Sequence, residues 1–288
     1  MALQLEFVNP VGSFKIRGAA HALAAQQARG VLSGVATFST GNHGTAVAYM
    51  AQRLGVSARV FVPTTVPAVK IAQLEQWGAM VTISGVTQDD AARQCQEVAR
   101  SEGLLLVPPF DDADVIAGQG TAGWDLMAHW PDVDTVLVPV SGGGLLSGVA
   151  LAVKAVNPRA RVIGVGARHA GSMAASVRAG RPVDAPESST WADSLLGGLG
   201  GDNRFTLGLV RRWVDEIVEV SEEEIVEALC YLMEHHRLMV EGAAAVGVAA
   251  LLTGRVAGGA STAVLLTGNV VDANRVMQAW QARPAALP

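Results

Sequence analysis

Cysteine is scarce in this sequence: Cys95 and Cys230 are the two examples, and they lie far apart without the close spacing of metal ligands. We therefore expect two reduced thiols packed inside the protein, and neither a disulfide framework nor a cysteine-based metal site. Long apolar runs are also missing, because no stretch approaches the roughly 18 residues that span a bilayer. The segment Met1–Phe7 lacks the pattern of a signal peptide. These absences predict a soluble, cytoplasmic protein with no membrane partner.

Positive charge is limited as well. Lys and Arg number 21 against 26 Asp and Glu, the net charge is −5, and the basic residues form no long run. A nucleic-acid partner is therefore not expected. Aromatic residues make up 5% of the chain, whereas half of it is apolar and 32 residues are glycine. This composition is typical of an α/β protein, whose tight turns between strands and helices need glycine.

Short, β-branched, apolar segments alternate along the chain with stretches whose apolar residues recur every three or four positions. The alternation predicts an α/β fold of open, mostly parallel, twisted sheets flanked by helices, with ligands at the carboxyl ends of the strands. The expected strands are Gly34–Phe38, Ala58–Val62, Met80–Ile83, Thr135–Val140, Arg161–Val165 and Ala263–Thr267. The expected helices are His43–Leu54, Lys70–Trp77, Gln88–Glu102, Gly120–His129, Gly144–Val156 and Glu222–His236.

The same pattern predicts two domains. Residues 33–111 are expected to form a small inserted α/β domain, and residues 1–32 with 112–288 a larger one. A chain of 288 residues is long enough for either one large domain or two modest ones with a substantial core.

Lysine is rare enough that its positions are informative, since the chain contains three: Lys15, Lys70 and Lys154. Lys70 and Lys154 fall in amphipathic helical patterns that are typical of solvated lysines. Lys15 instead lies at the end of a turn-rich segment that runs into a helix, where the macrodipole disfavours a cation. That cost disappears if the amine forms an imine, as lysine does with pyridoxal phosphate (PLP).

The segment Ser141–Gly148 follows an expected strand and opens an expected helix. Its three consecutive glycines let backbone N–H groups converge on an anion at the helix start. The spacing matches neither a dinucleotide fingerprint nor a P-loop, and it suits a single phosphate better than a pyrophosphate. A plain tight turn is the alternative.

Three further segments offer polar groups where ligands are expected. Ser39–Gly44 could hold a carboxylate or a cofactor oxygen, or could simply cap a helix. Leu265–Asn269 ends a strand with a hydroxyl, or is an ordinary turn. Glu241 precedes a small-residue helix and is either a helix-dipole partner or a site residue.

In this order, these segments resemble the fold type II, tryptophan-synthase-like PLP enzymes, specifically the threonine/serine dehydratases. The resemblance extends over nearly the whole chain. Finer features are similar to the branch of hydroxyectoine-utilisation dehydratases. The general motifs are Pro10–Ala19, Ser39–His43 and Pro109–Thr121, and the finer ones Leu5–Phe7, Ala192–Leu195, Asp202–Arg204 and Val240–Ala243.

The resemblance implies roles for individual residues. Lys15 would hold PLP as a Schiff base, and Phe14 would lie against the pyridine ring. Asn42 would bond the phenolic oxygen, and Thr267 the ring nitrogen. The substrate carboxylate would lie among Ser39, Thr40, Gly41 and His43, and the phosphate would be held by the backbone N–H groups of Gly142, Gly143, Gly144 and Leu145.

The activity so implied is the elimination of water from a β-hydroxy amino acid, in amino acid catabolism. L-Threonine, L-serine or a hydroxyectoine-derived substrate would yield a 2-oxo acid and ammonia, with Lys15 as the base. A β-replacement enzyme and a serine racemase are the alternatives, although racemases of this family have a serine where this chain has Thr40. A non-catalytic PLP- or ligand-binding relative is a third. A dinucleotide-dependent oxidoreductase is disfavoured, because no acidic residue occurs from Gly142 to Arg168.

The resemblance leaves two features open. A divalent cation site would include Ala192 and Asp193, but Ser189 stands where the family has a glutamate. Relatives also have some tens of residues before the lysine motif, whereas fourteen precede Lys15, so we expect a supporting segment to be absent or the start to be misplaced. Relatives suggest a homodimer.

Overall fold

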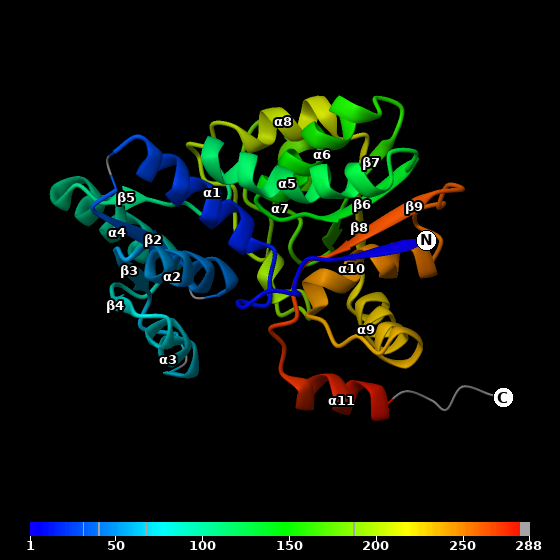
Figure 1. The fold of residues 1–288 in the computed structure, drawn as a ribbon. Helices are drawn as coiled ribbons and strands as arrows, with labels where there is room; N and C mark the ends of the chain where they lie inside the picture. The colour runs from blue at the N-terminus through cyan, green and yellow to red at the C-terminus, as the bar shows by residue number, and fades with distance from the viewer. Residues whose placement is uncertain (31, 40, 67, 187, 283–288) are drawn as a thin grey trace.

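The computed structural model describes residues 1–30, 32–39, 41–66, 68–186 and 188–282. Two separate sheets, both built of parallel strands, organise the chain (Figure 1). The larger sheet has the order β1-β9-β6-β7-β8 and the smaller one β4-β3-β2-β5. The strands are β1 (Ala2–Leu5), β2 (Gly34–Phe38), β3 (Ser57–Val62), β4 (Ala79–Ile83), β5 (Leu105–Leu106), β6 (Thr135–Pro139), β7 (Arg161–Ala167), β8 (Glu216–Val220) and β9 (Thr262–Leu266).

The larger sheet is covered on both faces (Figure 1). Alternate residues of β6 point to opposite sides: Val136 and Val138 pack with the cluster that includes Leu146, whereas Leu137 packs with the cluster that includes Ala244. This is the pattern of a fully buried parallel strand. The helices around this sheet are α5 (Ala113–His129), α6 (Gly144–Val156), α7 (Ser172–Ala179), α8 (Thr206–Trp213), α9 (Glu222–Tyr231), α10 (Gly242–Leu252) and α11 (Ala273–Gln281).

The smaller sheet is likewise covered on both faces. Phe61 packs with Cys95 of α4 (Gln88–Glu102). Val60 packs on the other side, with Leu74 of α3 (Ala68–Gln76) and with α2 (Asn42–Leu54). Helix α1 (Lys15–Ala28) contacts both α2 and α5, so it lies between the two sheets (Figure 1).

The fold class expected from the sequence is confirmed, and each expected strand is present to within a residue or two. Strands β1, β5 and β8 were not expected. Helix α5 begins at Ala113 rather than Gly120, because the Asp112 side chain accepts the Val115 N–H and caps it. The prediction of a helix over Glu222–His236 was wrong at its C-terminal end, because α9 stops at Tyr231 and a π-helical turn follows.

The structure also bears on the two cysteines and on the expected lack of a membrane span. Cys95 and Cys230 are both buried thiols, as expected. Within the described ranges, no helix combines the length and apolar character that crossing a bilayer requires. The division into domains at residues 33–111 stays a prediction.

Candidate active site

The start of α1 is tied to the end of β9. Ser13 forms an antiparallel bridge with Gly268, and the Phe14 N–H donates to the Thr267 carbonyl over 2.9 Å. These bonds join segments that are more than 250 positions apart in sequence. As a result, Lys15 emerges beside the carboxyl end of β9, at the edge where a parallel sheet binds ligands.

The amine of Lys15 lies in the interior, although the residue as a whole is only half-buried. Its Nζ donates to the Pro109 carbonyl over 2.7 Å and lies 5.2 Å from the centre of the Phe14 ring. Burial lowers the pKa of Lys15 to about 8, with the nearby Glu241 carboxylate acting in the opposite direction. A substantial fraction of this amine is therefore neutral near neutral pH, as a nucleophile or base must be.

The glycine turn after β6 leads into α6 without a side-chain cap. Gly143 has φ +87°, a left-handed conformation that glycine adopts without strain. A Cβ on Gly142 would lie 2.4 Å from the Phe110 ring, so the turn can pack this closely only with glycine. The N–H groups of Gly144, Leu145 and the rest of the first turn have no intrahelical acceptor and are available to an anion.

The start of α2 also lacks a side-chain cap, and Gly41 is its N-cap residue. The Gly41 N–H donates to Ser39 Oγ over 3.3 Å, and a Cβ on Gly41 would meet nothing within 4 Å. Open space therefore adjoins this turn. Thr40, which the sequence placed here too, lies outside the described residues.

His43 is buried, and its Nε2–H donates to the Val107 carbonyl over 3.0 Å. Burial, together with the charge on Lys15, lowers the pKa of His43 to about 3 despite that hydrogen bond. The imidazole is therefore neutral, and its side chain is directed to Val107. Its contribution to carboxylate binding stays a prediction that rests on its backbone N–H in the first turn of α2.

Asn42 and Glu241 form a direct contact between α2 and α10. The Asn42 Nδ2 lies 3.1 Å from each carboxylate oxygen of Glu241. Burial raises the pKa of Glu241 to about 7, against the opposing effect of the Asn42 hydrogen bond. Of the two interpretations that the sequence left open, this contact favours a site residue.

The remaining predicted positions are also placed. Thr267 is buried at the end of β9, beside the Lys15 segment. The Ala192 N–H donates to Thr190 Oγ1 over 3.0 Å, and Asp193 begins a short 3₁₀ helix, η1 (Asp193–Leu195). In the part of the chain that the structure describes, no three His, Cys, Asp or Glu side chains are grouped to hold a metal ion. The structure thus adds no support for a cation at Ala192 and Asp193.

Three neighbours of the site carried no role in the sequence interpretation: Pro109, Phe110 and Asp111. Pro109 binds Lys15 and Phe110 packs on the glycine turn. The Asp111 carboxylate accepts three successive N–H groups at the start of α8, those of residues 204–206, over 2.6–3.0 Å. These three residues belong to the Pro109–Thr121 motif, but the residues that they contact lie too far along the chain for any local pattern to reveal them.

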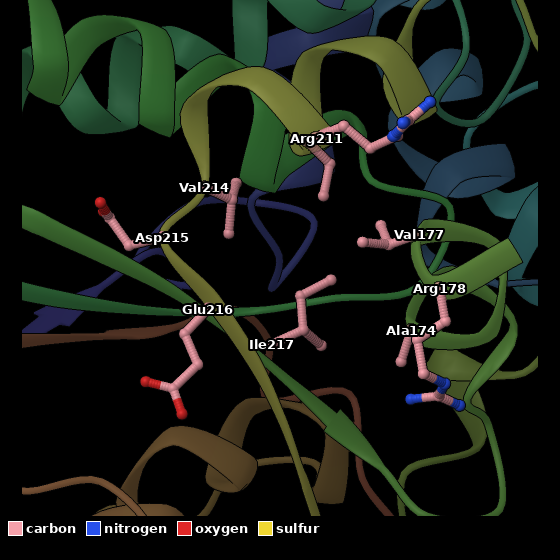
Figure 2. A pocket seen from close by; sticks show the side chains of 9 residues that line it. Ala174, Val177, Arg178, Arg211, Val214, Asp215, Glu216 and Ile217 are labelled. Atoms are coloured by element: carbon pink, nitrogen blue, oxygen red, sulfur yellow. The ribbon is translucent and has the colours of Figure 1, made fainter. Parts of the chain in front are cut away.

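A hollow of about 310 Å³ lies elsewhere, between α7, α8 and β8 (Figure 2). Figure 2 shows Val177, Val214 and Ile217 directed into it, whereas Asp215 points away. Asp215 is paired with Lys154 over 2.8 Å. The other carboxylate that lines the hollow, Glu216, is paired with Arg161 over 3.0 Å. None of the lining residues is among those predicted to bind PLP or substrate, so the chemistry is not expected there.

The chain is similar to a known protein family over most of its length. The family described as "Pyridoxal-phosphate dependent enzyme" matches residues 1–268. An L-threonine ammonia-lyase of Thermotoga maritima is 40% identical over 95% of this chain and 68% of its own length. A catabolic L-threonine dehydratase of Escherichia coli is 37% identical over 96% of this chain and 84% of its own. The structure of maize serine racemase superposes with a TM-score of 0.88 at 33% identity, covering 97% of this chain and 86% of that one.

Proposed function

The chain belongs to the family of pyridoxal-phosphate dependent enzymes, and we propose that it is a dehydratase that eliminates water from a β-hydroxy amino acid. The products are a 2-oxo acid and ammonia. The observation that carries this proposal is the interior amine of Lys15, with a pKa of about 8, next to two uncapped helix starts. The relatives named threonine dehydratase or threonine ammonia-lyase, similar over most of the chain, support it.

The residues present fit PLP. Lys15 supplies an amine with a large neutral fraction for the Schiff base, and the first turn of α6 supplies N–H donors for a single phosphate. Asn42 supplies an amide donor for the phenolic oxygen. Phe14 would lie against the ring, and the buried Thr267 would offer its hydroxyl to the ring nitrogen.

When bound, PLP would supply an electron sink, which makes the proton on the substrate Cα easier to remove. The N–H groups at the start of α2, with Ser39 and Gly41, would bind the substrate carboxylate and so orient its Cα toward Lys15. The neutral Lys15 amine would take the Cα proton, and the Pro109 carbonyl would accept the resulting ammonium N–H. Since Thr267 would offer a neutral hydroxyl, the ring nitrogen would stay largely unprotonated, which favours elimination over reactions that need a long-lived carbanion.

Several finer statements belong to the same proposal. L-Threonine, L-serine and a hydroxyectoine-derived amino acid are the candidate substrates; relatives named for threonine support the first. The resemblance in the sequence motifs supports a homodimer, in which residues 33–111 would close as a small domain over the substrate. The two buried thiols, Cys95 and Cys230, support a cytoplasmic location.

Serine racemisation is the second candidate function, and the similarity to maize serine racemase favours it. Purified protein loaded with PLP should be given L-threonine, L-serine, or L-serine with a thiol. Formation of 2-oxo acid supports the dehydratase, D-serine the racemase and a thioether the β-replacement alternative. Lys15→Ala should abolish the product, whereas Lys154→Ala, which removes a lysine paired with Asp215, should not. A purified protein that shows no sign of binding when PLP is added up to saturating concentration would refute the proposal.

A further inference from the structure

Glu241 is a buried carboxylate in an unusual position. It is the N-cap residue of α10, yet its side chain makes no capping hydrogen bond to that helix. An N-cap carboxylate ordinarily accepts an N–H group of the first turn. Glu241 instead reaches Asn42, which is 199 positions away in sequence and begins a helix packed on the other sheet. The backbone is fixed independently, because the Glu241 N–H donates to the Gly268 carbonyl over 3.1 Å.

The charges around Glu241 come from several elements. Lys15 of α1 and Lys70 of α3 favour its ionised form, and Asp193 of η1 disfavours it. Burial has the largest effect, and it raises the pKa of Glu241 to about 7. The Glu241 carboxyl group therefore loses its proton near pH 7, at the lower end of the pH range in which the Lys15 ammonium loses its own.

The orientation of an asparagine amide depends on such a partner. Its two ends have nearly the same shape, and only hydrogen-bond partners decide which end faces which way. An ionised carboxylate accepts hydrogen bonds and donates none, so it holds Asn42 Nδ2 toward itself and leaves the second N–H of that nitrogen for another acceptor. A protonated Glu241 can also donate, and the amide can then turn its oxygen toward it.

We propose that Glu241 is a positioning residue, whose ionised carboxylate fixes the Asn42 amide so that its second N–H serves the phenolic oxygen of PLP. The inference rests on the proposed function and adds to it a residue that acts through Asn42. A purely structural role at the start of α10 would leave cofactor binding independent of the charge on Glu241.

The test measures PLP binding to the cofactor-free protein through its tryptophan fluorescence, above and below pH 7. Glu241→Ala should weaken binding about tenfold above that pH, since a hydrogen bond to a charged group is worth roughly 1.5–3 kcal/mol and 1.4 kcal/mol is tenfold. Glu241→Gln should bind as the wild type does below pH 7 and more weakly above it. The matched control is Glu224→Gln, which neutralises a carboxylate in the first turn of α9, paired with Arg255.

A double-mutant cycle separates positioning from stability. Because Glu241 acts through Asn42, adding Glu241→Ala to Asn42→Ala should cost nothing further in PLP affinity. Gly268→Ala gives a second route that keeps every charge, since its Cβ would lie 2.4 Å from the Glu241 Oε1 and displace the carboxylate. It should weaken PLP binding in the same pH-dependent way, and circular dichroism checks that each variant is folded.

The outcomes distinguish the two claims. Wild-type protein that binds no PLP overturns the proposed function, and the inference with it. Wild-type protein that binds PLP, with Glu241→Gln and Glu224→Gln showing the same affinity and pH profile as the wild type, overturns the inference alone. So does an additive cycle with Asn42→Ala. If the Glu241 variants do not fold, an unchanged affinity and pH profile in Gly268→Ala overturns it.

Discussion

The acidity of Lys15 gives a prediction that needs neither substrate nor cofactor. An ordinary lysine with a pKa of 10.5 is about 0.3% neutral at pH 8, whereas a lysine with a pKa of about 8 is about half neutral. Lys15 should therefore hold roughly 150 times more free amine than an ordinary lysine at that pH, as the same pKa difference requires. The cause is burial of its amine, only partly offset by the negative charge of Glu241.

Competitive labelling with an amine reagent measures this directly. The cofactor-free protein would be labelled briefly over a range of pH, with a free lysine derivative as internal standard, and digested for mass spectrometry. Because the chain has three lysines, the peptides of Lys15, Lys70 and Lys154 are easily told apart. Burial lowers the labelling rate of Lys15 at every pH. The informative quantity is therefore the pH at the midpoint of the curve of labelling rate against pH.

We expect a midpoint near pH 8 for Lys15, and a lower one in Glu241→Gln, since that variant loses the charge that stabilises the ammonium. A midpoint that coincides with the free lysine derivative would refute the reasoning, because the amine would then be as well solvated as in water.

Three further predictions concern the surroundings of the site. Gly143→Ala should cost about 1–2 kcal/mol in urea unfolding because of its left-handed backbone, and should weaken PLP binding; unchanged stability would contradict the turn geometry. Asp111→Ala should cost about 2 kcal/mol by removing the acceptor at the start of α8, whereas a loss within error would mean that solvent replaces it. For Glu241, the folded state binds the proton more tightly than the unfolded one, so stability should fall as pH rises from 4.5 to about 7. That pKa difference corresponds to about 3 kcal/mol, which unfolding of Glu241→Gln over the same range should not show.

The sequence was sufficient for most of the fold because the central strands are locally distinctive. Strand β6 (Thr135–Pro139) is an uninterrupted apolar, β-branched run, as strands buried on both faces are. Strand β8 (Glu216–Val220) lies at the edge of its sheet, and its two glutamates break the apolar pattern that identifies the others. Strand β1 (Ala2–Leu5) is recognisable only through its pairing with β9, which no local pattern encodes.

The same distinction applies to the site. The scarcity of lysine and the glycine turn after β6 mark Lys15 and the start of α6 in the sequence itself. The contact of Lys15 with Pro109 joins positions 94 apart, and that of Asn42 with Glu241 joins positions 199 apart. The shifted pKa values of Lys15 and Glu241 arise mainly from burial. The protonation behaviour of the site therefore could not be predicted before the fold was known.

The central claim is that Lys15 carries the cofactor. Borohydride reduction of the PLP-loaded protein fixes the imine as a stable amine, and peptide mass spectrometry then identifies the modified lysine. The account predicts one phosphopyridoxyl group per chain, located on Lys15, with Lys70 and Lys154 unmodified. Modification of Lys70 or Lys154 in its place, or no modification at saturating PLP, would contradict it.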